Sequence, residues 1–185
     1  LRVLPPSGRV LISAPRRMDL ETIRLFAISR LGWIKKQQNK ILAQERETPS
    51  EYLDGESHFV WGERYLLKVI EAGGLPSVEL RHGELLLHVR PGSGKEKRQA
   101  ALDAWYRRQL TQALPPLIAK WEPLMGVKVA RFFVRRMKTR WGSCTHRTRS
   151  LRFNTELAKK PPHCLEYLVV HEMAHLLEPS HNARF

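Results

Sequence analysis

The chain has few cysteines, no long apolar run and fewer acidic residues than basic ones. Its two cysteines, Cys144 and Cys164, are too few for a disulfide framework, so we expect a reduced, cytoplasmic setting. No apolar stretch approaches the length of a membrane span and no signal-peptide pattern opens the chain, so we expect no membrane partner. The C-x-x-C pairs that are typical of structural zinc sites are also absent.

Acidic residues are outnumbered: 32 Lys and Arg stand against 18 Asp and Glu, which gives a formal net charge of +14. Such an excess attracts polyanions and acidic substrates. It is equally typical of a basic soluble surface, because net charge affects steering more than specific function. We therefore keep nucleic acid and acidic peptides or proteins as candidate partners.

At 185 residues the chain has room for one domain or two small ones. It begins at Leu1 without a methionine and ends at Phe185, which suggests a fragment. The sequence Pro-Gly-Ser-Gly at residues 91–94 reads as a linker. We place a division there, between an N-terminal region at 1–94 and a metal-binding region at 95–185, which together could also form one continuous domain.

An H-E-x-x-H motif, His171-Glu172-Met173-Ala174-His175, lies in an apolar run near the C-terminus. On a helix, residues four apart point the same way, so the two imidazoles can share one ion. Glu172 is rotated by about 100° around the axis and can reach a water on that ion instead. Because two histidines and a glutamate are costly to bury without a task, the pattern indicates metal-assisted hydrolysis rather than satisfied core histidines.

A catalytic zinc takes three protein ligands, and two residues compete for the third place. His181 follows His171 by ten positions, which is the offset in H-E-x-x-H-x-x-G-x-x-H zincins. Pro179 comes just after the position where those enzymes have glycine, so the turn differs from theirs. We predict His181 as the third ligand. Glu178, three residues after His175, is the rival ligand or an acceptor for an imidazole N–H.

The N-terminal half predicts helices and then strands. We expect a strand at 9–13, a helix from Leu20 with Asp19 as its N-cap, a break at Gly32 and a second helix to about Arg46. Residues 59–61 with 65–69, and 78–80 with 84–89, have the pattern of two hairpins. We expect them to form an antiparallel meander.

The C-terminal half predicts a helix from Lys95 to about Leu114, which Pro115-Pro116 interrupts. Strands are expected at 127–134 and 151–154, with a turn at 141–144 between them. In sites of the H-E-x-x-H type, an edge strand beside the metal helix lets an extended peptide add as a further strand. Residues 140–143 or 151–154 are the candidates for that edge.

Several segments resemble the YgjP-like metal-dependent hydrolases, a branch of zincin-like metallopeptidases allied to the SprT-like proteins. They are residues 136–144 (RMKTRWGSC), 151–154 (LRFN), 169–175 (VVHEMAH) and 180–185 (SHNARF). The resemblance implies zinc at His171, His175 and His181, with Glu172 as the base. It also implies an α+β, zincin-like fold with a small antiparallel sheet against the metal helix. Family members usually continue with a further helix that packs on the site.

We therefore predict a zinc-dependent hydrolase, and more specifically a metallopeptidase, in which Glu172 takes a proton from an activated water. Arg140 and Tyr167 are candidates for stabilising the oxyanion. Zinc suits histidine ligands, although nickel, cobalt and manganese also bind them.

An alternative is a nucleic-acid-binding module with a structural zinc, in which Cys144, Cys164 or His163 supplies a fourth ligand. A protease recruited to nucleic acid would combine both functions, and it predicts an affinity for nucleic acid that falls steeply with salt.

Overall fold

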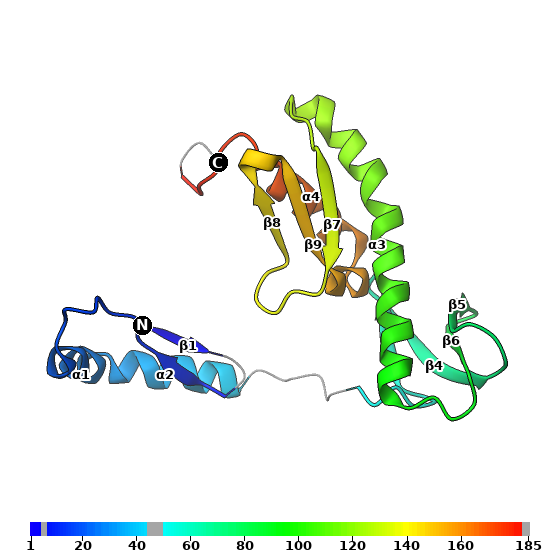
Figure 1. Cartoon of the computed structure of the whole chain (residues 1–185), viewed down its shortest axis with the longest axis horizontal. Helices are drawn as coiled ribbons and strands as arrows, with labels where there is room; N and C mark the ends of the chain where they lie inside the picture. The colour runs from blue at the N-terminus through cyan, green and yellow to red at the C-terminus, as the bar shows by residue number, and fades with distance from the viewer. Residues whose placement is uncertain (5–6, 44–49, 183–185) are drawn as a thin grey trace. The chain divides into compact units, whose positions relative to one another are not determined.

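The computed structural model describes residues 1–4, 7–43 and 50–182 (Figure 1). They form two compact units, Leu1–Pro49 and Ser50–Phe185. The helix that follows residue 94 packs against both sheets of the second unit; the division into regions 1–94 and 95–185 stays a prediction. None of the helices in the described ranges combines the length and apolar character that crossing a membrane requires.

The first unit contains a small hairpin and two helices. β1 (Arg2–Leu4) and β2 (Arg9–Leu11) are antiparallel, and α1 (Leu20–Ser29) is followed by α2 (Leu31–Leu42). Asp19 caps α1 as predicted, because its carboxylate accepts the backbone N–H of Thr22 at 2.9 Å. The predicted break between the two helices is present, but it lies at Arg30 rather than at Gly32. The helices separate at Arg30, whose N–H turns back to the carbonyl of Ala27 and tightens the last turn of α1. Residues 44–46 of the predicted second helix lie outside the described residues.

The second unit begins with a four-stranded sheet in the order β3-β4-β6-β5. Its strands are β3 (Ser57–Val60), β4 (Glu63–Glu71), β5 (Ser77–Arg81) and β6 (Glu84–Val89). Both predicted hairpins are present, but the predicted antiparallel meander is wrong, because β4 pairs in parallel with β6 rather than with β5. Residues 85–87 of β6 form a continuous buried leucine run, which is stable at the centre of a sheet and not at its edge.

A long helix, α3 (Lys95–Met125), connects the two sheets of this unit. The predicted interruption at Pro115-Pro116 is wrong, because the helix continues through both prolines and through Pro123. The apolar face of α3 explains why: it stays buried on both sides of the prolines, so packing offsets the hydrogen bonds that they remove. The buried residues of that face are Leu102, Trp105, Tyr106, Leu110, Leu114 and Ile118.

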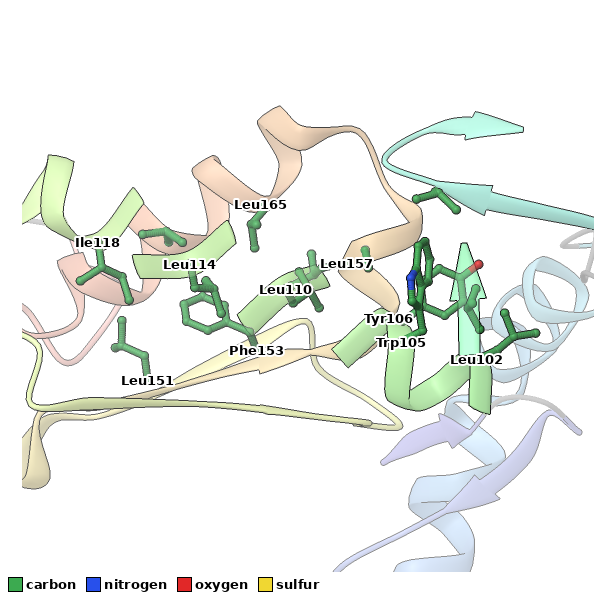
Figure 2. Packing of buried hydrophobic residues seen from close by; sticks show 14 of the residues in the cluster. Leu102, Trp105, Tyr106, Leu110, Leu114, Ile118, Leu151, Phe153, Leu157 and Leu165 are labelled. Carbon is green, nitrogen blue, oxygen red and sulfur yellow. The ribbon is translucent and has the colours of Figure 1, made fainter. Parts of the chain in front are cut away.

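A second sheet, in the order β7-β9-β8, covers part of α3. Its strands are β7 (Arg131–Arg135), β8 (Gly142–Thr145) and β9 (Ser150–Asn154), and the short 3-10 helices η1 (His146–Thr148) and η2 (Thr155–Lys159) flank β9. The predicted turn at 141–144 is wrong, because residues 142–145 pair antiparallel with β9. Figure 2 shows Leu151 and Phe153 of β9 in the same core as Leu110 of α3 and Leu165 of α4 (Pro162–Ala174).

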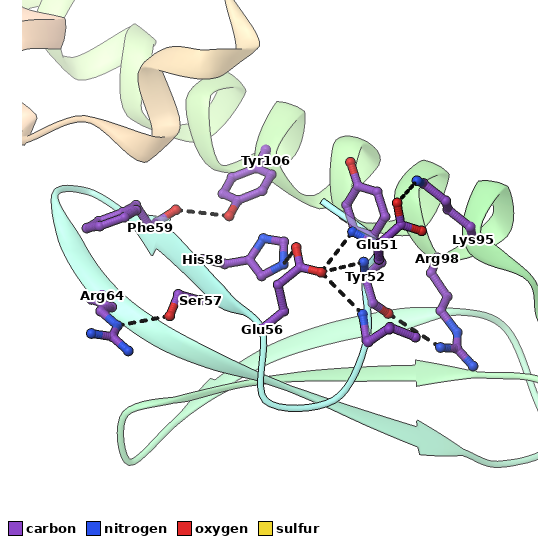
Figure 3. A network of polar contacts seen from close by, with 11 residues as sticks. Glu51, Tyr52, Glu56, Ser57, His58, Phe59, Arg64, Lys95, Arg98 and Tyr106 are labelled. Atoms are coloured by element: carbon purple, nitrogen blue, oxygen red, sulfur yellow. Dashed lines mark hydrogen bonds and ion pairs between the residues drawn. The ribbon is translucent and has the colours of Figure 1, made fainter. Parts of the chain in front are cut away.

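Polar contacts attach the segment before β3 to α3 (Figure 3). The Glu56 carboxylate accepts the backbone N–H groups of Glu51 and Tyr52 at 2.9 and 2.6 Å. Lys95, in the first turn of α3, pairs with Glu51 at 2.6 Å, and the Tyr106 hydroxyl donates to the carbonyl of Phe59 at 2.9 Å. These bonds hold the edge of the first sheet against the helix. The α+β class predicted from the sequence is confirmed by this architecture. The predicted small antiparallel sheet beside the metal helix is wrong, because β7 pairs in parallel with β9 and only β8 pairs with β9 in the antiparallel direction.

The turns of the two hairpins offer a matched test of whether the β3–β4 turn packs against Pro161. Gly62 and Gly83 both have left-handed backbones, with φ of +90° and +83°. A Cβ on Gly62 would lie 2.9 Å from Cγ of Pro161, whereas a Cβ on Gly83 would meet nothing within 4 Å. Gly83→Ala is expected to cost about 1–2 kcal/mol of unfolding free energy, from the backbone alone. Gly62→Ala is expected to cost roughly 2–4 kcal/mol, because overpacking is added.

Urea unfolding of the two variants and the wild type measures this difference. Equal losses of stability would show that the β3–β4 turn does not pack against Pro161 in solution.

Candidate metal centre

Helix α4 carries His171 and Glu172 of the H-E-x-x-H motif, has His175 as its C-cap, and is held in place from its opposite face. Leu165, Val169 and Met173 are spaced four apart and are fully buried in the core. Glu166 fixes the helix to α3, because its carboxylate accepts the Lys120 ammonium at 2.6 Å and the Trp121 indole N–H at 3.0 Å. The helix begins with Pro162, which suits a first helical position because its missing N–H has no intrahelical partner to lose. His171 and Glu172 therefore lie on a rigid support.

Three imidazoles converge at the C-terminal end of α4. Each of His171, His175 and His181 offers one ring nitrogen, and these nitrogens all lie within 4.8 Å of one another. The Nε2 atoms of His171 and His181 are 3.2 Å apart. Two nitrogens bound to one tetrahedral zinc at about 2.0–2.1 Å would be about 3.3–3.4 Å apart. The donor atoms and their spacing thus fit a zinc ion.

The Glu178 carbonyl orients His175. His175 Nδ1 lies 3.1 Å from this carbonyl oxygen, which can only accept, so Nδ1 carries the proton and Nε2 is the nitrogen with a lone pair for a metal. The rival assignment of Glu178 as a ligand is not supported by its position: the Glu178 carboxylate instead accepts the Ser180 hydroxyl at 3.1 Å. Glu178 lies beside the histidine group through its backbone and is not a member of it.

Glu172 is buried against the backbone of β8. Its residue is 4% exposed, and the neighbour that makes room for it is Gly142. A Cβ at Gly142 would lie 2.5 Å from Oε1 of Glu172 and 2.9 Å from Cδ. Burial raises the pKa of Glu172, although His175 and Arg140 act in the opposite direction. Glu172 is thus a carboxyl group whose protonated form is favoured more than usual, directly beside three imidazoles.

A pocket of about 410 Å³ opens over these groups. One side is formed by the histidines, Glu172 and Pro179, and the other by β8 and the residues around it. The residues contributed by the second side are Arg140, Gly142, Ser143, Cys144 and His146. Of the two candidate edges, β8 is the outer strand of its sheet and β9 is the central one, so the pocket lies along a sheet edge.

The structure places the remaining sequence candidates in different positions. Arg140 lines the pocket, whereas exposed Tyr167 lies outside it, with its ring centre 6.0 Å from that of His171. His163 and Cys164 line a separate hollow with Tyr167 and Trp141.

Cys144 lines the metal pocket, but no fourth His, Cys, Asp or Glu joins the three histidines within the described ranges. Burial, and then the Glu172 charge, raises the pKa of the Cys144 thiol, which disfavours the thiolate that a metal requires.

The sequence analysis missed Gly142 and His146 as residues of the site. Gly142 is the first residue of the short strand β8 and His146 follows its last residue, in a segment for which the sequence predicts a turn. A glycine within a strand often marks a close approach of another group to the backbone, but this signal for Gly142 needs the strand to be recognised first.

An α+β domain that brings an H-E-x-x-H helix beside the edge of a small sheet fits a metallopeptidase-like domain. The chain belongs to the YgjP-like family: the model of the YgjP-like metallopeptidase domain matches residues 1–185, the whole chain. The resemblance seen in the sequence is thereby confirmed, and the family indicates a metal-dependent hydrolase. Neither the curated proteins nor the solved structures contain a match to this chain.

Removal of one histidine tests the metal site. His181→Ala is expected to weaken zinc binding at least about 100-fold, because loss of a ligand exceeds the effect of losing an outer-shell partner. His146→Ala is the matched control, since His146 lines the same pocket but lies outside the group of three. Titration with a chelating zinc dye measures both. Equal affinity in His181→Ala and the wild type would remove His181 from the site.

The pKa of His171 provides a second test of the metal site. Burial, followed by the charges of His175 and His181, lowers the pKa of His171 from its ordinary value. A lowered pKa keeps the imidazole neutral, and so able to bind metal, down to a more acidic pH. In the metal-free protein, the imidazole C–H resonance of His171 should therefore titrate with a midpoint below about 6.5, the ordinary histidine pKa, when it is followed by NMR. A midpoint at or above that value would contradict this environment for His171.

Proposed function

We propose that this protein is a zinc-dependent peptidase in which Glu172 is the general base. One observation carries the proposal: a buried carboxylate and three converging imidazoles share a pocket that runs along a sheet edge. His171, His175 and His181 would hold the zinc. When bound, zinc supplies Lewis acidity, which activates water and polarises a carbonyl at neutral pH.

Glu172 moves the proton in this mechanism. As the attacking water adds to the scissile carbonyl carbon, a Glu172 carboxylate oxygen accepts the proton that the water loses. The same oxygen then donates this proton to the leaving amine as the C–N bond breaks. A buried carboxyl with a raised pKa suits both steps, because accepting and returning a proton is most efficient when the pKa lies near the working pH.

Strand β8 provides a place for the substrate backbone. Its inner edge is hydrogen-bonded to β9, and Ser143 and Cys144 line the pocket on the other side. An extended peptide could pair with this edge and present a carbonyl to the histidine group. Arg140, in the same pocket, favours an acidic side chain near the scissile bond. Arg140 also remains the candidate for stabilising the oxyanion.

The alternative of a structural zinc receives less support from this geometry. A structural site is typically closed by four protein ligands, whereas the described residues offer a group of three beside a pocket. The choice of zinc over other metals and the cytoplasmic setting stay predictions.

Replacement of the base tests the function directly. Glu172→Gln keeps the size of the side chain but cannot accept the proton, so peptide hydrolysis should fall about 10²- to 10⁴-fold. Zinc content should be unchanged, because Glu172 lies outside the histidine group. Hydrolysis of a fluorogenic peptide mixture and metal analysis are measured on the same preparations. Full activity in Glu172→Gln would rule out Glu172 as the base.

The close approach at Gly142 gives an independent test. Gly142→Ala should push Glu172 out of place and reduce hydrolysis about 100-fold, since a displacement of about 1 Å can have an effect of this size. Ser143→Ala is the control, because this neighbouring change removes only a hydroxyl. Zinc binding should survive in both variants. If Gly142→Ala retained wild-type activity, the carboxylate would not depend on this contact.

A further inference from the structure

The second sheet and its loops carry a large share of the basic charge of the chain. Residues 127–154 contain no Asp or Glu. The same segment contains nine basic residues: Lys128, Arg131, Arg135, Arg136, Lys138, Arg140, Arg147, Arg149 and Arg152. Only Lys128 and Arg136 form ion pairs within the described residues, with Glu122 at 2.9 Å and Asp103 at 3.9 Å. The other seven are exposed, except for Arg152, which is partly buried.

Strand alternation concentrates part of this charge on one face of the sheet. Phe132 and Val134 of β7, with Leu151 and Phe153 of β9, pack into the core. The intervening residues therefore point the other way. We call the face formed by Arg131, Phe133, Arg135, Arg152 and Ser143 the basic face. The register aligns Phe133 with Arg152 and Arg152 with Ser143, so the face extends across all three strands.

An exposed aromatic ring lies in the middle of the basic face. Phe133 is 38% exposed, although it is a large apolar residue. The guanidinium carbons of Arg135 and Arg152 lie 5.9 and 5.8 Å from the centre of its ring. Arg152 is also oriented by a hydrogen bond to the hydroxyl of Thr145 at 2.7 Å. Two cations thus lie close to a ring that is partly open to solvent.

We propose that the basic face binds single-stranded nucleic acid. Phe133 stacks on a base, and Arg131, Arg135 and Arg152 contact the phosphates on either side of it. A flat sheet that presents an aromatic ring among arginines combines the two contributions that single strands require, stacking and backbone charge. A duplex would leave Phe133 without a partner, because its bases are already stacked on one another. An acidic peptide would use the arginines and leave the ring unused.

The basic face adjoins the metal pocket. Ser143 belongs both to the basic face and to the lining of the metal pocket, and Arg140 lines the pocket as well. A single strand of nucleic acid bound across the basic face would therefore run beside the metal pocket, where it could position proteins attached to the same nucleic acid. The proposal goes beyond the peptidase function and does not rest on it, because none of the nucleic-acid contacts involves the histidines or Glu172.

The test uses fluorescence anisotropy of a 5′-fluorescein-labelled 20-nucleotide oligothymidylate with the whole chain. Phe133→Leu keeps an apolar contact with the sheet but removes the ring, and it is expected to weaken binding about tenfold, the usual effect of losing a stacked base. Phe133→Tyr should retain wild-type affinity. Thermal unfolding checks that both variants are folded.

Charge is tested with a matched pair of double variants. Arg131→Ala with Arg135→Ala removes two charges from the basic face. Arg107→Ala with Arg108→Ala removes two from the exposed surface of α3. For the first pair, the slope of log affinity against log salt should decrease by about 1.4, since each phosphate contact on a single strand contributes about 0.7. The second pair should leave the slope unchanged.

A competition experiment distinguishes single-stranded nucleic acid from a duplex and from an acidic polypeptide as the ligand of the basic face. Unlabelled oligothymidylate should displace the probe at lower concentration than a duplex or a polyglutamate of equal charge. Equal displacement by polyglutamate, with no effect of Phe133→Leu, would overturn the proposal in favour of an acidic protein partner. Tighter binding of the duplex would overturn the preference for single strands. Glu172→Gln should bind like the wild type, so loss of peptidase activity and loss of nucleic-acid binding are separable results.

Discussion

The close contact between the Glu172 carboxylate and the backbone of β8 is the constraint on which the site depends. It requires α4 to lie almost against the strand, and only the missing side chain of Gly142 allows this distance. Apolar packing on the opposite face of α4, together with the bonds from Lys120 and Trp121 to Glu166, holds the helix there. The result is a buried carboxyl group with a raised pKa. Burial of a carboxyl group is costly, and the proton transfer proposed for Glu172 would explain why the fold retains it.

The sheet β7-β9-β8 separates two kinds of chemistry. Its inner face is apolar and supports α3 and α4, and its outer face carries Arg131, Phe133 and Arg152. The alternation of side chains along a strand makes this separation possible within only five residues of β7. The edge strand β8 belongs to both environments, because Gly142 and Cys144 face α4 while Ser143 follows the basic face. The proposed peptide path and the proposed nucleic-acid path therefore adjoin along one strand.

Local signals predicted the hairpins and the cap at Asp19 correctly, but failed where distant packing decides the outcome. Pro115 and Pro116 are strong helix breakers, yet the buried face from Leu102 to Ile118 keeps α3 continuous. Hairpin signals do not predict the strand order of the first sheet, because they do not specify whether β4 pairs with β5 or with β6. Residues 142–145 include glycine and serine, which suggested a turn, and only pairing with β9 makes them a strand.

The sequence by itself determined the family, the α+β class and the pairing of His171 with His175, since residues four apart share a helical face wherever the helix lies. The approach of His181 to His171, the carbonyl of Glu178 behind His175 and the space at Gly142 were decided by the tertiary structure. These features depend on the path of the chain after α4 and on contact between segments about thirty residues apart. No local pattern encodes such distances, because they arise only when helix, sheet and core pack together.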